Sequence, residues 1–161
     1  MRLNKYRQEH RLNNGIERKP TPSDWDIRDA EEALSLSFPG SYKLFVRQAG
    51  TCPLIFDEVF WIGSEGETYR DIVKVKKDTM GDGDLQEFLI PFYADGYGNY
   101  VCFDTRKDDA GEYVVVFWDH EEQLAERLDD LEVVADNFAA WFIQEVKEQI
   151  EEDQAIGEDE E

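Results

Sequence analysis

The sequence has few of the residues that would crosslink the chain or anchor it in a membrane. It has two cysteines in 161 residues, Cys52 and Cys102, and they do not form a CxxC motif. No run of about 18 apolar residues is present, which excludes a membrane-spanning helix, and no charged segment leads into an apolar one as in a signal peptide. We therefore expect a cytoplasmic protein in which Cys102 is a small buried side chain. The sequence leaves a Cys52–Cys102 disulfide open.

Positive charge is scarce, with 17 Lys and Arg against 38 Asp and Glu and a formal net charge of -21. Such a surface repels phosphate groups, so we expect neither direct nucleic-acid binding nor binding to an anionic membrane. The acids either keep the protein in solution or attract a basic protein partner over long distances. The exception is a basic extension, residues 1–20, with six Lys or Arg against two Glu.

Histidine, a common catalytic base, occurs only as His10 and His120. No serine lies near either one, and a Cys102–His120 pair would require a cysteine inside a strand to face a cleft. The carboxylates are too numerous for any pair to stand out as a catalytic dyad. We therefore expect no enzymatic activity, and a small-molecule or metal-dependent enzyme is the weaker alternative.

The stretch FYADGYGNYVCFD, residues 92–104, is compatible with a phosphate loop, a metal site or a tight turn. A dinucleotide loop requires a third glycine and a following helix, whereas Gly96 and Gly98 precede a strand-like segment. The DTMGDGD segment is not an EF-hand loop either, because the residue six positions beyond Gly83 is Leu89 and not glutamate. Two glycines that tolerate positive φ, flanked by strands, predict a hairpin turn with neither cofactor nor metal.

The first helical pattern starts at a capping box formed by Ser23 and Asp26. Apolar residues then recur at helical spacing, and we expect Pro39 to end this helix. A short second helix is predicted over 41–46, closed by Gly50.

Two more helices are expected further along the chain. Residues 67–80 show both strand-like alternation and helical spacing, and their charge density favours a helix. Residues 136–152 predict a closing helix with Asp136 as its N-cap and an apolar stripe that needs a sheet to cover it. The remaining residues, 153–161, are predicted to be an acidic disordered tail.

Strands are expected mainly in the middle of the chain. Residues 53–63 are rich in β-branched and aromatic side chains and predict one strand or a bent pair. The runs EFLIPFYA, NYVCFD and EYVVVFWD, separated by GYGN and TRKDDAG, predict a β-meander. Because VVVFW is apolar at successive positions, we expect it to be covered on both faces. Residues 120–134 are predicted to be a loop with some helix.

In their order, these motifs resemble the SUKH superfamily, which groups fungal cell-wall-assembly regulators with bacterial toxin-immunity proteins. The resemblance covers about residues 22–150. It is carried by AEEALSLSFPGSYKLF, by Gln48-Ala49-Gly50, by YADGYGNYVCFD, and by VVFWDHE with the later ADNFAAWF. The chain departs from the family at Ala49, where asparagine is more usual, in the basic extension, and in an acidic insertion over 121–132.

The resemblance implies a single α+β domain, here residues 21–152, with an antiparallel sheet of about six strands and packed N-terminal and C-terminal helices. It also implies no enzymatic activity and no cofactor. Bacterial members are cytosolic antitoxins that bind and block a toxin domain, often a nuclease. The alternative is a regulatory or scaffold domain of the cell-wall-assembly type with no toxin partner. We expect a monomer or a weak homodimer.

A nuclease domain is basic because it holds nucleic acid, so an inhibitor that presents carboxylates would be steered to it. Aromatic side chains at strand ends and turns would supply the affinity. The candidate partner-binding residues are Asp57, Glu58, Trp61, Asp95, Tyr97, Asp104, Asp119 and Glu121.

Overall fold

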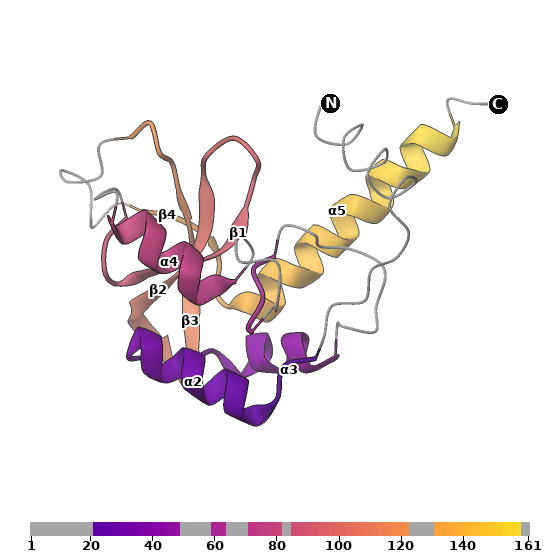
Figure 1. Cartoon of the computed structure of the whole chain (residues 1–161). Coiled ribbons are helices and arrows are strands. Elements are labelled where there is room, and N and C mark those ends of the chain that lie inside the picture. The colour runs from indigo at the N-terminus through magenta and orange to yellow at the C-terminus, as the bar shows by residue number, and fades with distance from the viewer. Residues whose placement is uncertain (1–20, 49–58, 64–70, 82–84, 123–130, 159–161) are drawn as a thin grey trace.

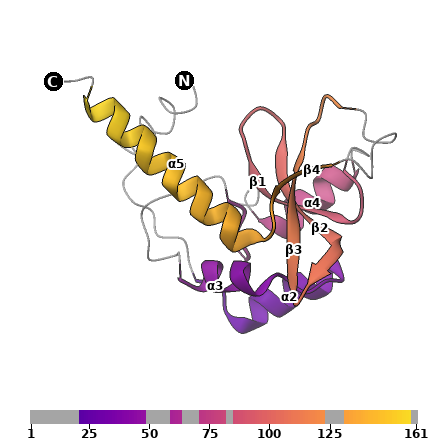
Figure 2. The same ribbon diagram turned by 180° about the vertical axis from the view of Figure 1, so that it is seen from behind.

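The computed structural model describes residues 21–48, 59–63, 71–81, 85–122 and 131–158. They form an α+β arrangement (Figure 1) whose elements are α2 (Asp24–Leu34), α3 (Gly40–Gln48), α4 (Ile72–Gly81), β1 (Leu89–Ala94), β2 (Tyr100–Asp109), β3 (Glu112–Trp118), β4 (Glu132–Ala135) and α5 (Phe138–Glu158). The strands make one antiparallel sheet in the order β1-β2-β3-β4. Figures 1 and 2 show α2 and α3 at one end of this sheet and α5 running outward from it.

The sheet has four strands in the described part of the chain, so the expectation of about six is wrong there. The predicted strand or bent pair at 53–63 accounts for part of the difference. Residues 53–58 lie outside the described residues, and 59–63 form only isolated bridges, to Tyr93 and Asp71.

The apolar composition of 59–62 reflects burial and not strand pairing. All four residues are buried, so their side chains do not alternate between a core face and a solvent face as those of a half-buried strand do. The segment is held by its backbone: the Phe60 N–H donates to the Phe92 carbonyl at 2.7 Å, and the Trp61 carbonyl accepts from Ile72 at 2.8 Å. Residues 59–62 are therefore a buried connecting segment and not a strand of the sheet.

The meander β1-β2-β3 is confirmed, and β3 is buried on both faces as its apolar run predicts. Because successive side chains point to opposite faces of a sheet, Val115 packs into the larger core and Val116 into a smaller core on the other face. Cys102 of β2 belongs to this smaller core. It is a free thiol with no exposed surface, and burial raises its pKa. Cys52 lies outside the described residues.

The segment TRKDDAG is mostly strand and not the predicted separator, because β2 continues to Asp109. The strand passes an irregularity between Asp104 and Asp108 and then pairs with β3 again. The turn itself consists of Ala110 and Gly111, both with positive φ (52° and 83°). Two consecutive residues of positive φ match the twist of an antiparallel pair, so a two-residue turn is sufficient.

The first helix begins as predicted and ends earlier. The Ser23 hydroxyl accepts the Asp26 N–H at 3.1 Å, and the Asp26 carboxylate accepts the Ser23 N–H at 2.7 Å, which is the predicted capping box. The helix ends before Pro39 because Ser35 adopts a left-handed φ of 53° and its N–H bonds back to the last turn. Pro39 instead precedes α3, and its carbonyl accepts a helical N–H at 3.0 Å.

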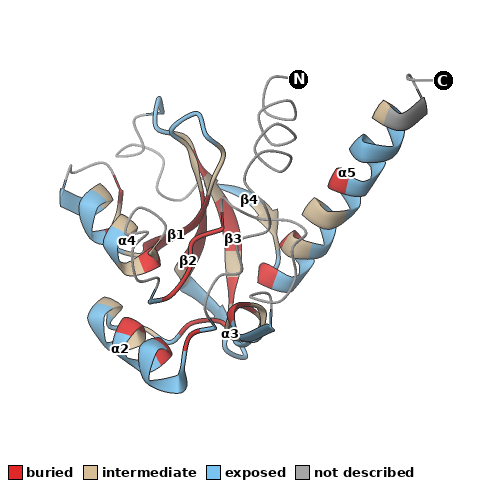
Figure 3. Cartoon of the chain, turned by 45° about the vertical axis from the view of Figure 1, so that its right-hand side comes forward, coloured by how far each residue is buried: buried red, intermediate tan, exposed pale blue. Residues whose placement is uncertain are grey.

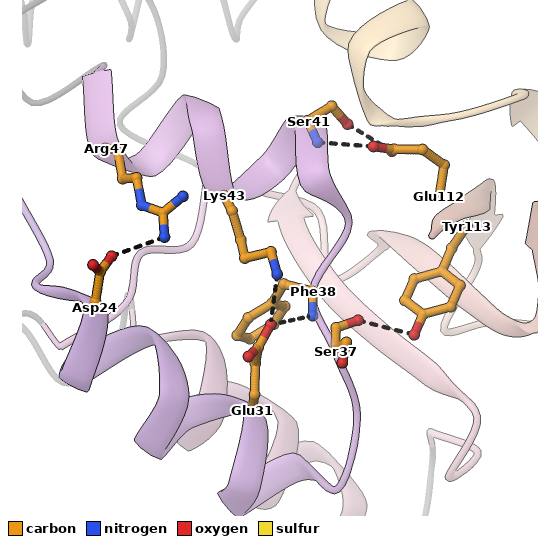
Figure 4. A network of polar contacts seen from close by, with 9 residues as sticks. All are labelled: Asp24, Glu31, Ser37, Phe38, Ser41, Lys43, Arg47, Glu112 and Tyr113. Atoms are coloured by element: carbon orange, nitrogen blue, oxygen red, sulfur yellow. Dashed lines mark hydrogen bonds and ion pairs between the residues drawn. The ribbon is translucent and has the colours of Figure 1, made fainter. Parts of the chain in front are cut away.

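Ion pairs join α2 to α3 across the loop between them (Figure 4). The Lys43 Nζ lies 3.2 Å from Glu31 Oε1, and the Arg47 Nη2 lies 2.8 Å from Asp24 Oδ1. Glu31 also accepts the backbone N–H of Phe38 at 2.8 Å. The two helices therefore form one unit.

The same unit is bonded to the sheet through β3 (Figure 4). Glu112 accepts the N–H and the hydroxyl of Ser41, at 2.8 Å and 2.7 Å, and the Tyr113 hydroxyl donates to the Ser37 carbonyl at 2.9 Å. A carboxylate that accepts from the first turn of a helix also complements the helix dipole. These contacts fix α2 and α3 at one end of the sheet.

The closing helix is confirmed, with different ends. Its N-cap is Asn137 and not Asp136, because the Asn137 side-chain oxygen accepts the Ala140 N–H at 2.9 Å. It extends to Glu158 and so includes the first part of the segment predicted to be a disordered tail. The preceding strand β4 overlaps the end of the predicted 120–134 loop, so that prediction is wrong for residues 132–134; residues 123–130 are outside the described part.

Tyr42 of α3 lies at the centre of the larger core. Its ring is 5.3 Å from that of Phe38, 5.5 Å from Phe103 and 5.3 Å from Phe138. Its hydroxyl donates to the Phe60 carbonyl at 2.6 Å. One side chain thus connects α3, the sheet, α5 and the 59–63 segment.

The helix predicted at 67–80 is confirmed from Ile72 onward as α4, whereas residues 67–70 lie outside the described residues and Asp71 forms a bridge with Trp61. One charged residue of α4 is buried. Lys76 is 2% exposed, and its Nζ donates to the carbonyls of Gln86 and Leu89 at 2.7 Å and 2.6 Å. Burial lowers the pKa of Lys76 to about 8, against smaller opposing effects of Cys102 and Glu87. The ammonium is therefore held by backbone carbonyls, at the cost of desolvation.

This depressed pKa predicts a rise in stability with pH. Between pH 8 and 10.5 the unfolded chain keeps the Lys76 proton that the folded chain has lost, so the unfolded state binds more protons and stability increases with pH. From pH 8 to pH 9 the free energy of unfolding of the wild type should rise by about 1 kcal/mol relative to Lys76→Met. Urea unfolding of both proteins at each pH measures this, and a difference that does not change with pH would contradict it.

Candidate functional site

The turn between β1 and β2 is held by the side chain of Asp95. Its Oδ1 accepts the N–H groups of Tyr97 and Asn99, at 2.7 Å and 3.2 Å, and its Oδ2 accepts the Asn99 side-chain N–H at 2.8 Å. Gly96 and Gly98 have φ of 82° and 97°, which an L side chain adopts only with strain. The hairpin predicted from the two glycines is therefore confirmed, with Asp95 as its internal brace.

The segment that follows β3 lies against this turn. The side-chain oxygen of Asn99 is 3.2 Å from the His120 backbone nitrogen, which donates to it, and 2.7 Å from His120 Nδ1. On the other side, Asp119 Oδ1 accepts the Glu121 N–H at 2.8 Å. The antiparallel pairing of Tyr100 with Trp118 brings these two segments to the same end of the sheet.

Four of the eight candidate residues thus come together on what we call the strand-end surface: Asp95, Tyr97, Asp119 and Glu121. Tyr97 is 62% exposed and Glu121 is exposed, whereas Asp95 and Asp119 are half-buried. Figure 3 shows that the strands change from buried to exposed as they reach this end. The arrangement brings one exposed tyrosine and three carboxylates to the same end of the sheet on two hydrogen-bonded turns. It suits a complementary basic surface and shows no paired acid and base.

Of the other four candidates only Trp61 and Asp104 are described, and neither lies on this surface. Asp57 and Glu58 are outside the described residues. Trp61 is 2% exposed in the larger core, with its ring 5.7 Å from that of Phe45, so it is a core aromatic and not a surface anchor.

The prediction that Asp104 binds a partner at the surface is also wrong. It has no exposed area, and its two oxygens accept from the Arg106 guanidinium at 3.0 Å and 2.9 Å. The Arg106 guanidinium in turn lies 3.8 Å from the centre of the Phe88 ring. The strand-end position predicted for Asp104 does not hold, because β2 continues past it.

Sequence reasoning missed one exposed aromatic residue. Trp25 of α2 is 69% exposed, and the Arg28 guanidinium lies 4.9 Å from its ring centre. The outward position of Trp25 follows from helical spacing, since the buried positions are Ile27 and Ala30. In Figure 1, α2 lies at the opposite end of the sheet from the β1–β2 turn, so Trp25 is not part of the strand-end surface.

Gly98 connects the turn to His120, and replacing it tests this contact. A Cβ on Gly98 would lie 3.1 Å from His120 Nδ1, whereas a Cβ on Gly111, which also has positive φ, would meet nothing within 4 Å. We expect Gly111→Ala to lower the free energy of unfolding by about 1 kcal/mol through backbone strain alone. Gly98→Ala should cost about 0.5–1 kcal/mol more, because His120 must also move.

Thermal unfolding of the two variants gives the comparison, and NMR of the His120 ring localises it. The His120 resonances should shift in Gly98→Ala and stay unchanged in Gly111→Ala. Equal costs with unchanged His120 resonances would mean that the turn and the segment after β3 are not coupled in solution.

We searched the described residues for a metal site and for a membrane-spanning helix. Among them, no three His, Cys, Asp or Glu side chains are grouped so as to hold a metal ion. None of the helices in the described part of the chain combines the length and apolarity needed to cross a bilayer.

Comparison with known protein families assigns most of the chain to a family. The sequence profile of the SUKH_6 family, described as SMI1-KNR4 cell-wall, matches residues 24–142. This range runs from the start of α2 into α5 and contains the whole strand-end surface. No curated protein matches the chain.

Proposed function

The chain belongs to the SUKH_6 (SMI1-KNR4 cell-wall) family, and from this we propose that it is a protein-binding module without enzymatic activity. More specifically, we propose an immunity protein that binds and blocks a basic toxin domain, most simply a nuclease, in the cytoplasm. The strand-end surface is the contact. The observation that carries the proposal is the exposed Tyr97 on the same end of the sheet as Asp95, Asp119 and Glu121, on two turns that are held by their own hydrogen bonds and joined by the Asn99–His120 contact.

Each part of this surface has a physical role in binding. A turn that is already ordered loses little conformational entropy when a partner docks. An exposed tyrosine buries a large area with only two rotatable bonds, which suits it as an anchor. The carboxylates carry the same sign of charge as substrate phosphates and accelerate encounter with a basic surface. The net charge of -21 adds a long-range attraction to the same partner.

The test is to look for a toxin gene beside this one and to measure binding of the chain to the basic nuclease domain that it encodes. The association rate constant should fall about tenfold or more between low and physiological ionic strength. Glu121→Lys should lower the low-salt association rate about threefold to tenfold, whereas Glu32→Lys, an exposed acid on α2, should change it less than about twofold. An association rate that does not depend on salt, or equal effects of the two variants, would contradict the electrostatic contact.

The family description favours a second candidate, a regulatory or scaffold domain of the cell-wall type. Such a domain would use the strand-end surface on a partner that is not a toxin. A gene with no neighbouring toxin gene, together with no inhibition of a basic nuclease at micromolar concentration, would support this candidate over the first.

A further inference from the structure

The Asn99 side chain joins the β1–β2 turn to the segment after β3, and its orientation is fixed from both sides. The Asp95 carboxylate only accepts hydrogen bonds, so the group 2.8 Å from its Oδ2 is the side-chain N–H of Asn99. The Asn99 oxygen therefore points toward His120. The His120 backbone N–H only donates, and its position 3.2 Å from that oxygen requires the same orientation.

This orientation decides which nitrogen of the His120 ring carries the proton. Nδ1 lies 2.7 Å from the Asn99 oxygen. An oxygen that offers only lone pairs must receive a proton at that distance. A neutral imidazole has one donor nitrogen and one acceptor nitrogen. Because Nδ1 is the donor, Nε2 of the neutral ring keeps its lone pair.

The lone pair of Nε2 is not used inside the described part of the chain. His120 is exposed, and its Nδ1 corner is the part of the ring that faces the turn. A Cβ on Gly98 would lie 3.1 Å from Nδ1, 3.2 Å from Cε1 and 3.4 Å from Cγ, whereas Nε2 is two bonds away from Nδ1. No hydrogen bond to Nε2 is present among the described residues. The turn therefore holds an exposed acceptor in a fixed orientation.

The charges around this acceptor are negative. The titratable groups on the two segments that meet here are Asp95, Tyr97, Asp119, Glu121 and Glu122. Four of these five are carboxylates, which attract the cationic groups of a basic partner to this end of the sheet. A lysine ammonium or an arginine guanidinium has donors and no acceptor. Nε2 supplies a neutral acceptor for such a group beside the carboxylates.

From these contacts we propose that His120 is a partner-binding residue, with Nε2 accepting a hydrogen bond from a lysine or arginine of the basic partner. The inference rests on the proposed function and adds to it a specific residue and a pH dependence. Protonation of Nε2 removes the acceptor and places a positive charge against the partner's cation. Nδ1 donates to Asn99 in both forms, so the turn itself does not change.

The sign of the pH dependence follows from the proton count. The bound chain has a neutral His120 ring, whereas the free chain takes up a proton at low pH. The complex therefore holds fewer protons than the free chain, and the affinity rises with pH across the range in which an imidazole ordinarily titrates, between about pH 5 and 8. Above that range the affinity should be level.

The first measurement needs no partner. NMR of the ring nitrogens in the free chain at about pH 8, where an imidazole is ordinarily neutral, should show the His120 proton on Nδ1 and a bare Nε2. A ring protonated mainly at Nε2 would overturn the inference, whatever the chain binds.

The second measurement compares binding of the basic nuclease domain at about pH 5.5 and about pH 8 by the wild type, His120→Asn and His10→Asn. Asparagine at position 120 can keep the donor to the Asn99 oxygen, but it has no Nε2 and does not titrate. His10→Asn removes the one other histidine of the chain and is the matched control.

We expect the wild type and the control to bind about tenfold more weakly at the lower pH. His120→Asn should bind about tenfold more weakly than the wild type at the higher pH and change less than about twofold with pH. Its melting temperature should stay within about 2 °C of the wild type, because an exposed side chain is replaced.

The possible failures of the binding measurement have different meanings. Equal affinity and equal pH dependence of the wild type and His120→Asn would overturn the inference and leave the proposed function standing. A lower melting temperature of His120→Asn with an unchanged pH dependence of binding would restrict His120 to holding the turn, which also overturns it. If the wild type does not bind the domain at either pH, the proposed function is wrong and the inference is wrong with it.

Discussion

Tyr42→Ala is expected to lower the free energy of unfolding by about 3–5 kcal/mol, since truncating a buried aromatic removes its burial and leaves a cavity. Tyr42 has no exposed area and touches rings from three other parts of the fold. Because domains are stable by only about 5–15 kcal/mol, this loss should lower the melting temperature by about 10 °C and leave a substantial unfolded population.

Two further variants separate packing from hydrogen bonding and from helix effects. Tyr42→Phe keeps the ring but leaves the Phe60 carbonyl without its 2.6 Å donor, which should cost about 1–3 kcal/mol. Leu44→Ala, in the same helix and 54% exposed, should cost less than about 0.5 kcal/mol. Chemical unfolding followed by tryptophan fluorescence measures all three. If Tyr42→Ala cost no more than Leu44→Ala, Tyr42 would not be the centre of the core.

Tyr97→Ala is expected to weaken binding of the basic partner domain by about tenfold to a hundredfold with little change in stability. An exposed aromatic at the middle of an interface typically supplies a large share of the affinity. Its loss should appear mainly in the dissociation rate, because the surrounding carboxylates still steer the encounter. Surface plasmon resonance separates the two rates.

The matched control is Trp25→Ala, which removes a more exposed aromatic ring at the other end of the sheet. Its dissociation constant should stay within about threefold of the wild type. Tight binding by Tyr97→Ala combined with weak binding by Trp25→Ala would move the interface from the strand-end surface to α2.

Local patterns were sufficient where a few neighbouring residues decide the structure. The Ser23–Asp26 capping box and the Gly96–Gly98 turn involve contacts within four residues, and both formed as predicted. The family resemblance, confirmed over 24–142, rests on the same kind of short ordered motifs.

The predictions from the sequence failed where the structure depends on contacts between residues that are far apart in the chain. Residues 59–62 have strand-like composition but are enclosed by the core, and Trp61 was therefore misassigned to the surface. Asp104 appeared to end a strand because the turn at Ala110 and Gly111 could not be located from composition. The short strand β4, hidden in an acidic segment, exists through its pairing with β3.

The sequence by itself determined the acidic character of the protein, its helix start, its hairpin and its family, because these depend on composition and on contacts between near neighbours. Only the tertiary structure decided which carboxylates and aromatics share a surface. That choice depends on the register of β2 with β3, which places Asp119 and Glu121 beside the Asp95–Asn99 turn, and on burial, which removes Trp61 and Asp104 from the surface. Register and burial are set by residues far apart in the chain, so no local pattern contains them.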